Sequence, residues 1–127
     1  MTAQMATPDE STGSGIEGYT SVEKWARATG QDAQPPETRA HHLEVLAGFT
    51  EFSGKTPDEL VNYCFLRKKD TGVRFVSTQR RIAMNKTIDE YVEAQGWVDK
   101  EAVVNANIVR SFLIHNGVFI QGKLWRG

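Results

Sequence analysis

The chain has 127 residues, 15 of them basic and 16 acidic, with a formal net charge of −1 and 39% hydrophobic residues. This length predicts one domain whose core needs no disulfide or metal support, and the single cysteine, Cys64, excludes an intramolecular disulfide framework. No apolar run approaches the roughly twenty residues that cross a bilayer, and the N-terminus lacks the order of a secretory signal. We therefore expect a soluble protein of a reducing compartment, the cytoplasm, without a membrane partner.

The charges are unevenly distributed along the chain. Between residues 67 and 86, seven basic residues stand against Asp70 alone, a balance of plus six. Residues 87–105 carry a balance of minus four, and no acidic residue follows position 105. A concentrated basic patch on a neutral protein can bind a polyanion such as DNA or RNA. A solvated loop and helix face is the alternative that charge alone leaves open.

The first 36 residues predict a tail and a short helix. Residues 1–18 are rich in Ser, Thr, Gly, Asp and Glu, which indicates a disordered tail. Residues 19–36 predict a short helix over 21–29, which Gly30 ends, and then a linker that prolines at 35 and 36 interrupt. Trp25 would dock this helix, but the sequence leaves open whether the helix packs on the rest of the chain.

Residues 37–118 predict four further helices. The first covers 37–53, where apolar residues recur at spacings of three and four. Gly54 favours a helix end, and the sequence Thr-Pro-Asp-Glu at 56–59 has the pattern of a capping box with proline at the first helical position. The second helix is therefore predicted over 57–67, followed by a polar turn at 68–72.

The third and fourth helices are predicted over 77–95 and 99–116, ended by Gly96 and Gly117, with Asp99 as the N-cap of the last one. The side chains expected to face inward are Met84, Ile82, Ile88, Tyr91 and Val92 on the third helix and Ala102, Ala106, Val109, Phe112 and Leu113 on the fourth. The end of the chain would be extended, with residues 118–120 as the one candidate strand. The fold class predicted is all-α, a compact four-helix bundle with an orthogonal or antiparallel arrangement and a short extra N-terminal helix.

No constellation of residues points to catalysis. The soft metal ligands are His41, His42, Cys64 and His115, and none of them stands in a ligand spacing. No serine occupies a strand-to-helix nucleophile turn, and paired carboxylates occur where helix starts and exposed faces normally carry them. We expect no enzyme activity in this chain, no metal, no cofactor and no small-molecule substrate.

A polar stripe on the third helix is the positive signal. Its members follow spacings of four, three and four, provided that the helix reaches back to residue 74: Arg74, Thr78, Arg81 and Asn85. Arg80 and Lys86 flank this stripe. Arginine and asparagine contact base edges, threonine and lysine contact phosphates, and a helix of this kind fits the major groove. An ordinary solvated helix face is the alternative interpretation.

Three phrases of the sequence, together with apolar residues at 43, 46, 49 and 52, suggest a family. They are Gly-Lys-Thr-Pro-Asp-Glu-Leu at 54–60, Ile-Asp-Glu-Tyr at 88–91, and Val-Arg-Ser-Phe-Leu-Ile-His-Asn-Gly-Val at 109–118. With them, residues 38–118 resemble the core-binding domain of tyrosine recombinases, the phage-integrase type of enzyme, in its archaeal or phage versions.

The resemblance implies a SAM-like helical bundle that forms one half of a C-shaped clamp around duplex DNA at a recombination site. Residues 119–127 would begin the linker to a catalytic domain that has no equivalent here, so the chain is expected to be an excised portion or a stand-alone relative. Double-stranded DNA and other recombinase protomers would be its partners, and it would be nucleoid-associated when bound to DNA.

The DNA-facing residues that the resemblance implies are Lys68, Lys69, Arg74, Arg80, Arg81 and Lys86, with Arg110 and His115 as secondary candidates. Thr78 and Asn85 join them from the polar stripe. The acidic residues Asp89, Glu90 and Glu93 on the same helix depart from this pattern, because they would repel phosphate unless they point away. The alternative function is a helical protein–protein interaction module that does not bind nucleic acid.

Overall fold

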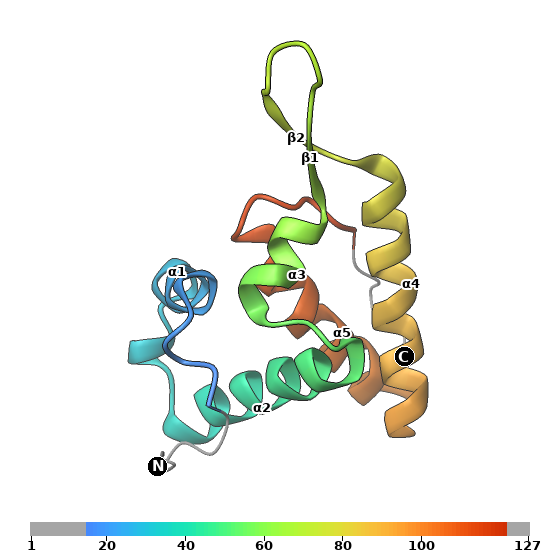
Figure 1. The fold of residues 1–127 in the computed structure, drawn as a ribbon. Helices are drawn as coiled ribbons and strands as arrows, with labels where there is room; N and C mark the ends of the chain where they lie inside the picture. The colour runs from blue at the N-terminus through green and yellow to red at the C-terminus, as the bar shows by residue number, and fades with distance from the viewer. Residues whose placement is uncertain (1–14, 122–127) are drawn as a thin grey trace, which may run out of the picture.

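The computed structural model describes residues 15–121, and this part of the chain is mostly helical with one small sheet (Figure 1). The elements are α1 (Thr20–Thr29), the 3-10 turn η1 (Gln31–Ala33), α2 (Pro36–Ser53), α3 (Pro57–Tyr63), β1 (Phe65–Arg67), β2 (Arg74–Val76), α4 (Thr78–Gln95) and α5 (Asp99–Ile114). Among the described residues, no helix combines the length and the apolar content that crossing a membrane requires.

The helices pack around one core, and the hairpin of β1 and β2 projects from it (Figure 1). α5 contacts α1, α2 and α4, while α1 also packs on α3. The fully buried apolar side chains come from all the main helices: Val22, Leu46, Phe49, Leu60, Ile88, Val109, Phe112 and Leu113. The hairpin leaves this body between α3, which precedes β1, and α4, which follows β2.

The corner between α2 and α3 is as predicted. Gly54 follows α2 with φ of 73°, a left-handed conformation that costs glycine little. The Thr56 side chain accepts a hydrogen bond from the Glu59 N–H, and the Glu59 carboxylate accepts one from the Thr56 N–H at 2.8 Å. The predicted capping box and the predicted start of α3 are thereby confirmed.

The second helix is shorter than predicted. α3 ends at Tyr63 instead of continuing to residue 67, and the chain then forms the antiparallel pair β1–β2, in the register Phe65 with Val76, Leu66 with Phe75 and Arg67 with Arg74. Between the strands, the Asp70 side chain accepts a hydrogen bond from the Thr71 N–H, and Gly72 has φ of 72°. The segment predicted as a polar turn is thus the loop of a hairpin, and the fold is not purely α-helical.

The last helix also differs in detail. α5 ends at Ile114, two residues before the predicted end, and its N-cap is Val98, without a side-chain cap, while Asp99 has φ of 56°. Residues 118–120 do not form the candidate strand, although Val118 and Ile120 are buried in the core. On α4, Met84, Ile88 and Tyr91 are buried as predicted, but Ile82, predicted to face inward, is 66% exposed.

The short N-terminal helix packs firmly on the body. Trp25 of α1 is 1% exposed, donates its indole N–H to the Ser111 hydroxyl at 3.2 Å and lies edge-on to the Phe112 ring. Ile16, which falls within the tail predicted to be disordered, is buried in the core. The tail prediction for residues 1–14 and the linker prediction for residues 122–127 lie outside the described residues.

Candidate nucleic-acid interface

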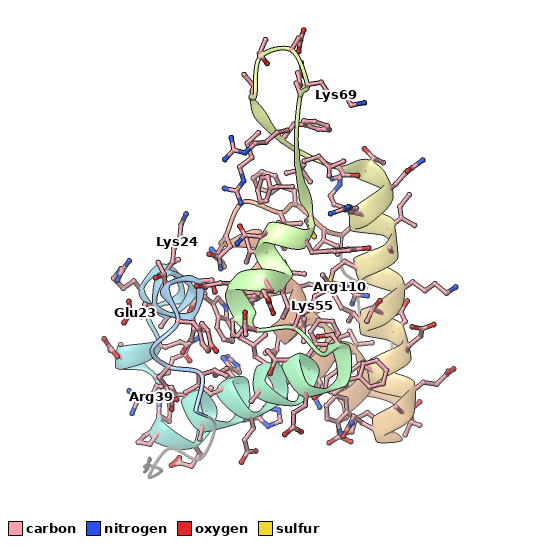
Figure 2. The ribbon with its side chains drawn as sticks, viewed as in Figure 1. Glu23, Lys24, Arg39, Lys55, Lys69 and Arg110 are labelled. Atoms are coloured by element: carbon pink, nitrogen blue, oxygen red, sulfur yellow. The ribbon has the colours of Figure 1, made fainter. Side chains whose placement is uncertain are left out.

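The hairpin carries the densest group of exposed cations in the described part of the chain. We call residues 65–76 the basic hairpin, because Arg67, Lys68, Lys69 and Arg74 on it are all exposed and only Asp70 opposes them. Figure 2 shows Lys69 near the free end, well clear of the helices. A projecting two-stranded ribbon with this charge can approach a polyanion without a clash from the helical body.

Two of the arginines are held in place. Arg67 and Arg74 are cross-strand partners and therefore lie on the same face of the ribbon. The Arg74 guanidinium lies 3.7 Å above the centroid of the Phe65 ring and donates a hydrogen bond to the Asn62 side chain at 2.9 Å. The Arg67 guanidinium donates to the Gly72 carbonyl at 3.0 Å. Binding an anion would therefore cost these side chains less conformational entropy than freely rotating ones lose.

The opposite face of the basic hairpin is apolar. Leu66, Val73 and Phe75 are 37%, 55% and 38% exposed. Leu66 and Phe75 are directly paired across the strands, so their side chains form a continuous apolar surface. The hairpin thus has one face with two arginines and one face with hydrophobic side chains.

The polar stripe predicted on α4 does not form as one helical face. Arg74 belongs to β2, before the helix begins, and only Thr78 and Lys86 are freely exposed. Arg80 donates to the Tyr63 carbonyl at 3.0 Å and lies over the Tyr63 ring, while Arg81 donates to the Phe119 carbonyl at 2.8 Å. Arg80 and Arg81 therefore fasten the base of the hairpin and the segment after α5 to α4, and both are half-buried.

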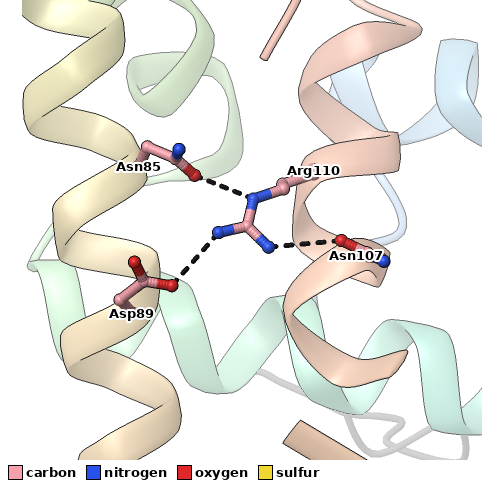
Figure 3. Close-up of polar contacts among 4 residues, drawn as sticks. All are labelled: Asn85, Asp89, Asn107 and Arg110. Carbon is pink, nitrogen blue, oxygen red and sulfur yellow. Dashed lines mark hydrogen bonds and ion pairs between the residues drawn. The ribbon is translucent and has the colours of Figure 1, made fainter. Parts of the chain in front are cut away.

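Arg110 and Asn85 lie between α4 and α5 (Figure 3). The Arg110 guanidinium is 2% exposed and donates to Asn85 at 2.8 Å, to Asn107 at 3.2 Å and to the Asp89 carboxylate at 3.1 Å. A side chain with this burial and these partners cannot reach a phosphate, so Arg110 is removed from the interface that the sequence suggested. Asn85 accepts one of these hydrogen bonds and therefore also lies between the helices. His115 is half-buried just after the last residue of α5.

The acidic residues Asp89, Glu90 and Glu93 lie in the half of α4 that is farther from the hairpin. The Asp89 carboxylate accepts a hydrogen bond from the Arg110 guanidinium, and Glu90 and Glu93 are exposed. Glu93 stands fifteen residues beyond Thr78, which places it about 22 Å along the helix axis from the hairpin end of α4. Lys86, in contrast, precedes Glu90 by four residues, so this lysine has an acidic neighbour on the same face of α4.

The described residues contain no group of three His, Cys, Asp or Glu side chains that could hold a metal ion. Cys64 is fully buried, and this burial raises the pKa of its thiol to about 11. Nucleophilic chemistry needs the thiolate, so Cys64 is a core residue.

Sequence reasoning missed the hairpin and two of the residues beside it. Arg67 belongs to the basic stretch but was not predicted as a site residue, and Lys24 on α1 has no basic residue within two positions that would mark it in the sequence. One signal in the sequence could have identified the hairpin. Apolar and basic residues alternate in Phe-Leu-Arg at 65–67 and in Arg-Phe-Val at 74–76, and the loop between them contains Asp-Thr-Gly.

Comparisons of the chain with protein-family models, with curated proteins and with solved structures found no match.

Proposed function

We propose that the chain is a non-catalytic DNA-binding domain, the SAM-like core-binding domain of a tyrosine recombinase, and that it grips duplex DNA at a recombination site. The observation that carries this proposal is the basic hairpin, whose exposed cations project from a helical body. The sequence phrases at 54–60 and 109–118 are the reason for naming the recombinase family. The protein would work in the cytoplasm, on the nucleoid, together with other recombinase protomers.

The proposed interface differs from the one that the sequence suggested. Its members are the exposed polar and basic residues of the hairpin and of the adjoining face of α4: Arg67, Lys68, Lys69, Arg74, Thr78 and Lys86. Arg80 and Arg81 act as positioning residues at the base of the hairpin, since their guanidinium groups already bond backbone carbonyls.

A two-stranded ribbon fits the major groove of B-DNA, which is about 12 Å wide. Lysines at the loop and arginines on one face would neutralise phosphates at the groove edges, which fixes the orientation of the protein without reading the sequence. Phosphate contacts dominate such an affinity, and each neutralised phosphate adds about 0.9 to the slope of log K against log salt concentration. A single half of a clamp would bind loosely, because it lacks the contacts of the opposing half.

The test is fluorescence anisotropy of a labelled duplex, titrated with protein at several salt concentrations. The double variant Lys68→Ala with Lys69→Ala should weaken binding and reduce the salt slope by about 1.8, the contribution of two phosphates. The matched control is Arg27→Ala with Lys100→Ala, which removes the same charge at exposed positions outside the hairpin. Absence of duplex binding by the wild-type protein at low salt, or equal effects of the two double variants, would refute the proposal.

The apolar face of the hairpin favours a second function, a protein–protein interaction module. Leu66, Val73 and Phe75 would then dock a partner. Static light scattering with and without duplex DNA separates the two functions, because a protein module forms its complex regardless of DNA. Phe75→Ser should abolish that complex, whereas it should leave the salt slope of DNA binding unchanged.

A further inference from the structure

Two hollows adjoin one another between α1, α3 and the basic hairpin. One, of about 370 Å³, is lined by Asn62, Phe65, Leu66, Arg67 and Arg74. The other, of about 300 Å³, lies against α1 and is lined by residues that include Thr20, Lys24, Asp58, Asn62 and Arg74. Since Asn62 and Arg74 line both, the two hollows form one surface, which we call the hairpin groove.

The lining of the hairpin groove is suited to an anion. Lys24, Arg67 and Arg74 supply three cations, and Asp58 supplies the one carboxylate. Figure 2 shows Lys24 on the side of α1 that faces the hairpin, whereas its neighbour Glu23 points away from it. Cations from two elements that are far apart in the sequence thus converge on one open space.

Asp58 is already engaged by α1. Its carboxylate accepts hydrogen bonds from both the N–H and the hydroxyl of Ser21. These bonds satisfy one carboxylate oxygen and reduce the negative potential that Asp58 exerts on the groove. They also fix α1 against α3, which keeps Lys24 in position beside the hairpin.

The register of the hairpin also places two like charges opposite each other. Arg67 and Arg74 are directly opposite each other in the register of the strands, and like charges in such a pair destabilise a sheet. Among the described residues, no carboxylate forms an ion pair with either arginine. A phosphate between them would replace the repulsion by charge-assisted hydrogen bonds to fork-shaped donors.

We propose that the hairpin groove binds a phosphodiester group of the nucleic-acid backbone, so that the interface continues from the hairpin onto α1 through Lys24. This proposal depends on the proposed DNA-binding function and assigns it a second contact, on an element outside the hairpin and α4. Arg74 stands at the centre, already oriented by the Phe65 ring and the Asn62 side chain. Lys24 would close the site from the α1 side.

The experiment uses the full chain and a labelled duplex, again by anisotropy at several salt concentrations. Lys24→Ala should weaken duplex binding by about three- to tenfold and lower the salt slope by about 0.9. The control Arg27→Ala removes the same charge from the same helix, outside the groove, and should leave both quantities unchanged.

Asp58→Asn provides a gain-of-affinity test. The amide oxygen of asparagine can still accept from Ser21, so α1 remains in place, while the charge that opposes phosphate is removed. Duplex binding should become about three- to fivefold tighter at low salt. Glu23→Gln, with the same charge change outside the groove, should have no effect. A merely structural role of Asp58 would not raise the affinity.

The phosphate bound in the hairpin groove could belong to a nucleic-acid backbone or be free inorganic phosphate, and a titration with each distinguishes the two. In NMR titrations, the Arg74 side-chain N–H and the Asn62 amide should shift with the duplex and, at higher concentration, with inorganic phosphate. Shifts with inorganic phosphate alone would overturn the assignment to a nucleic-acid backbone.

Two results separate the assignment of the hairpin groove from the proposed DNA-binding function. If the hairpin lysine variant loses duplex affinity while Lys24→Ala and Arg27→Ala behave alike, the groove assignment is wrong and the DNA-binding function stands. If the wild-type protein does not bind the duplex, both are refuted.

Discussion

Truncation of Arg110 should destabilise the fold and leave the DNA-binding surface intact. Arg110→Ala removes a 2% exposed guanidinium that donates to Asn85, Asn107 and Asp89. Removing one partner of a fully buried ion pair costs about 3–5 kcal/mol, because the other charge is left stranded. Asp89 is 49% exposed and can be hydrated instead, so we expect a smaller loss of about 2–3 kcal/mol, from the lost hydrogen bonds and the lost packing of the aliphatic stem.

The assay is urea denaturation followed by far-UV circular dichroism and by the fluorescence of the three tryptophans, of which Trp25 is buried. In thermal unfolding, a loss of this size would lower Tm by about 6–12 °C in a domain of this length. Arg110→Met is the informative companion, since it restores the volume without the charge and should recover about half of the lost stability. At a temperature where the variants remain folded, duplex affinity should equal that of the wild type. A variant with wild-type stability and reduced DNA affinity would refute the burial argument and return Arg110 to the interface.

Three further outcomes test the fold. Thr56→Ala removes the acceptor for the Glu59 N–H and should cost about 1 kcal/mol by urea denaturation, whereas Thr56→Ser should be close to neutral. Gly48→Ala should destabilise by about 1–3 kcal/mol, because an added Cβ would meet the Tyr91 hydroxyl, which already bonds the Val45 carbonyl; combining it with Tyr91→Phe should restore part of the loss. Burial raises the pKa of Cys64 from 9.0 to about 11 and that of Tyr91 from 10.0 to about 12. The neutral forms favour the folded state, so stability should be complete below pH 9 and decline as the pH rises towards 12, a trend that urea midpoints from pH 8 to 11 would reveal or contradict.

Local signals in the sequence predicted the ends of α2 and α4 and the start of α3 well, and the hairpin poorly. The capping box at 56–59 involves residues three positions apart, so its geometry is determined within one turn of helix. In contrast, Leu60, Val61 and Cys64 continue a helical spacing into Phe65, which made β1 indistinguishable from the end of a helix. Residues 65–67 form a strand because Phe65 pairs with Val76, and neither segment alone reveals this contact.

The sequence predicted an exposed basic stretch but not its arrangement on a hairpin. The basic stretch around residues 67–74 is exposed, as its charge suggested. Arg110 was misplaced because its burial is decided by partners on another helix, at positions 85 and 89, to which no sequence spacing points. Lys24 reaches the hairpin groove only through the packing of α1 on α3, which the sequence had left open.

The isolation of the hairpin has a consequence for the solubility of the protein. Each strand of a two-stranded sheet has an outer edge whose backbone N–H and C=O groups can pair with another chain. Here the exposed Leu66 and Phe75 on one face favour edge-to-edge association of two copies, whereas the strand length of only three residues limits it. Mutual repulsion of the surrounding arginines and lysines opposes it. Variants that neutralise the hairpin should therefore aggregate more readily than the parent protein, and high salt should have the same effect on the parent.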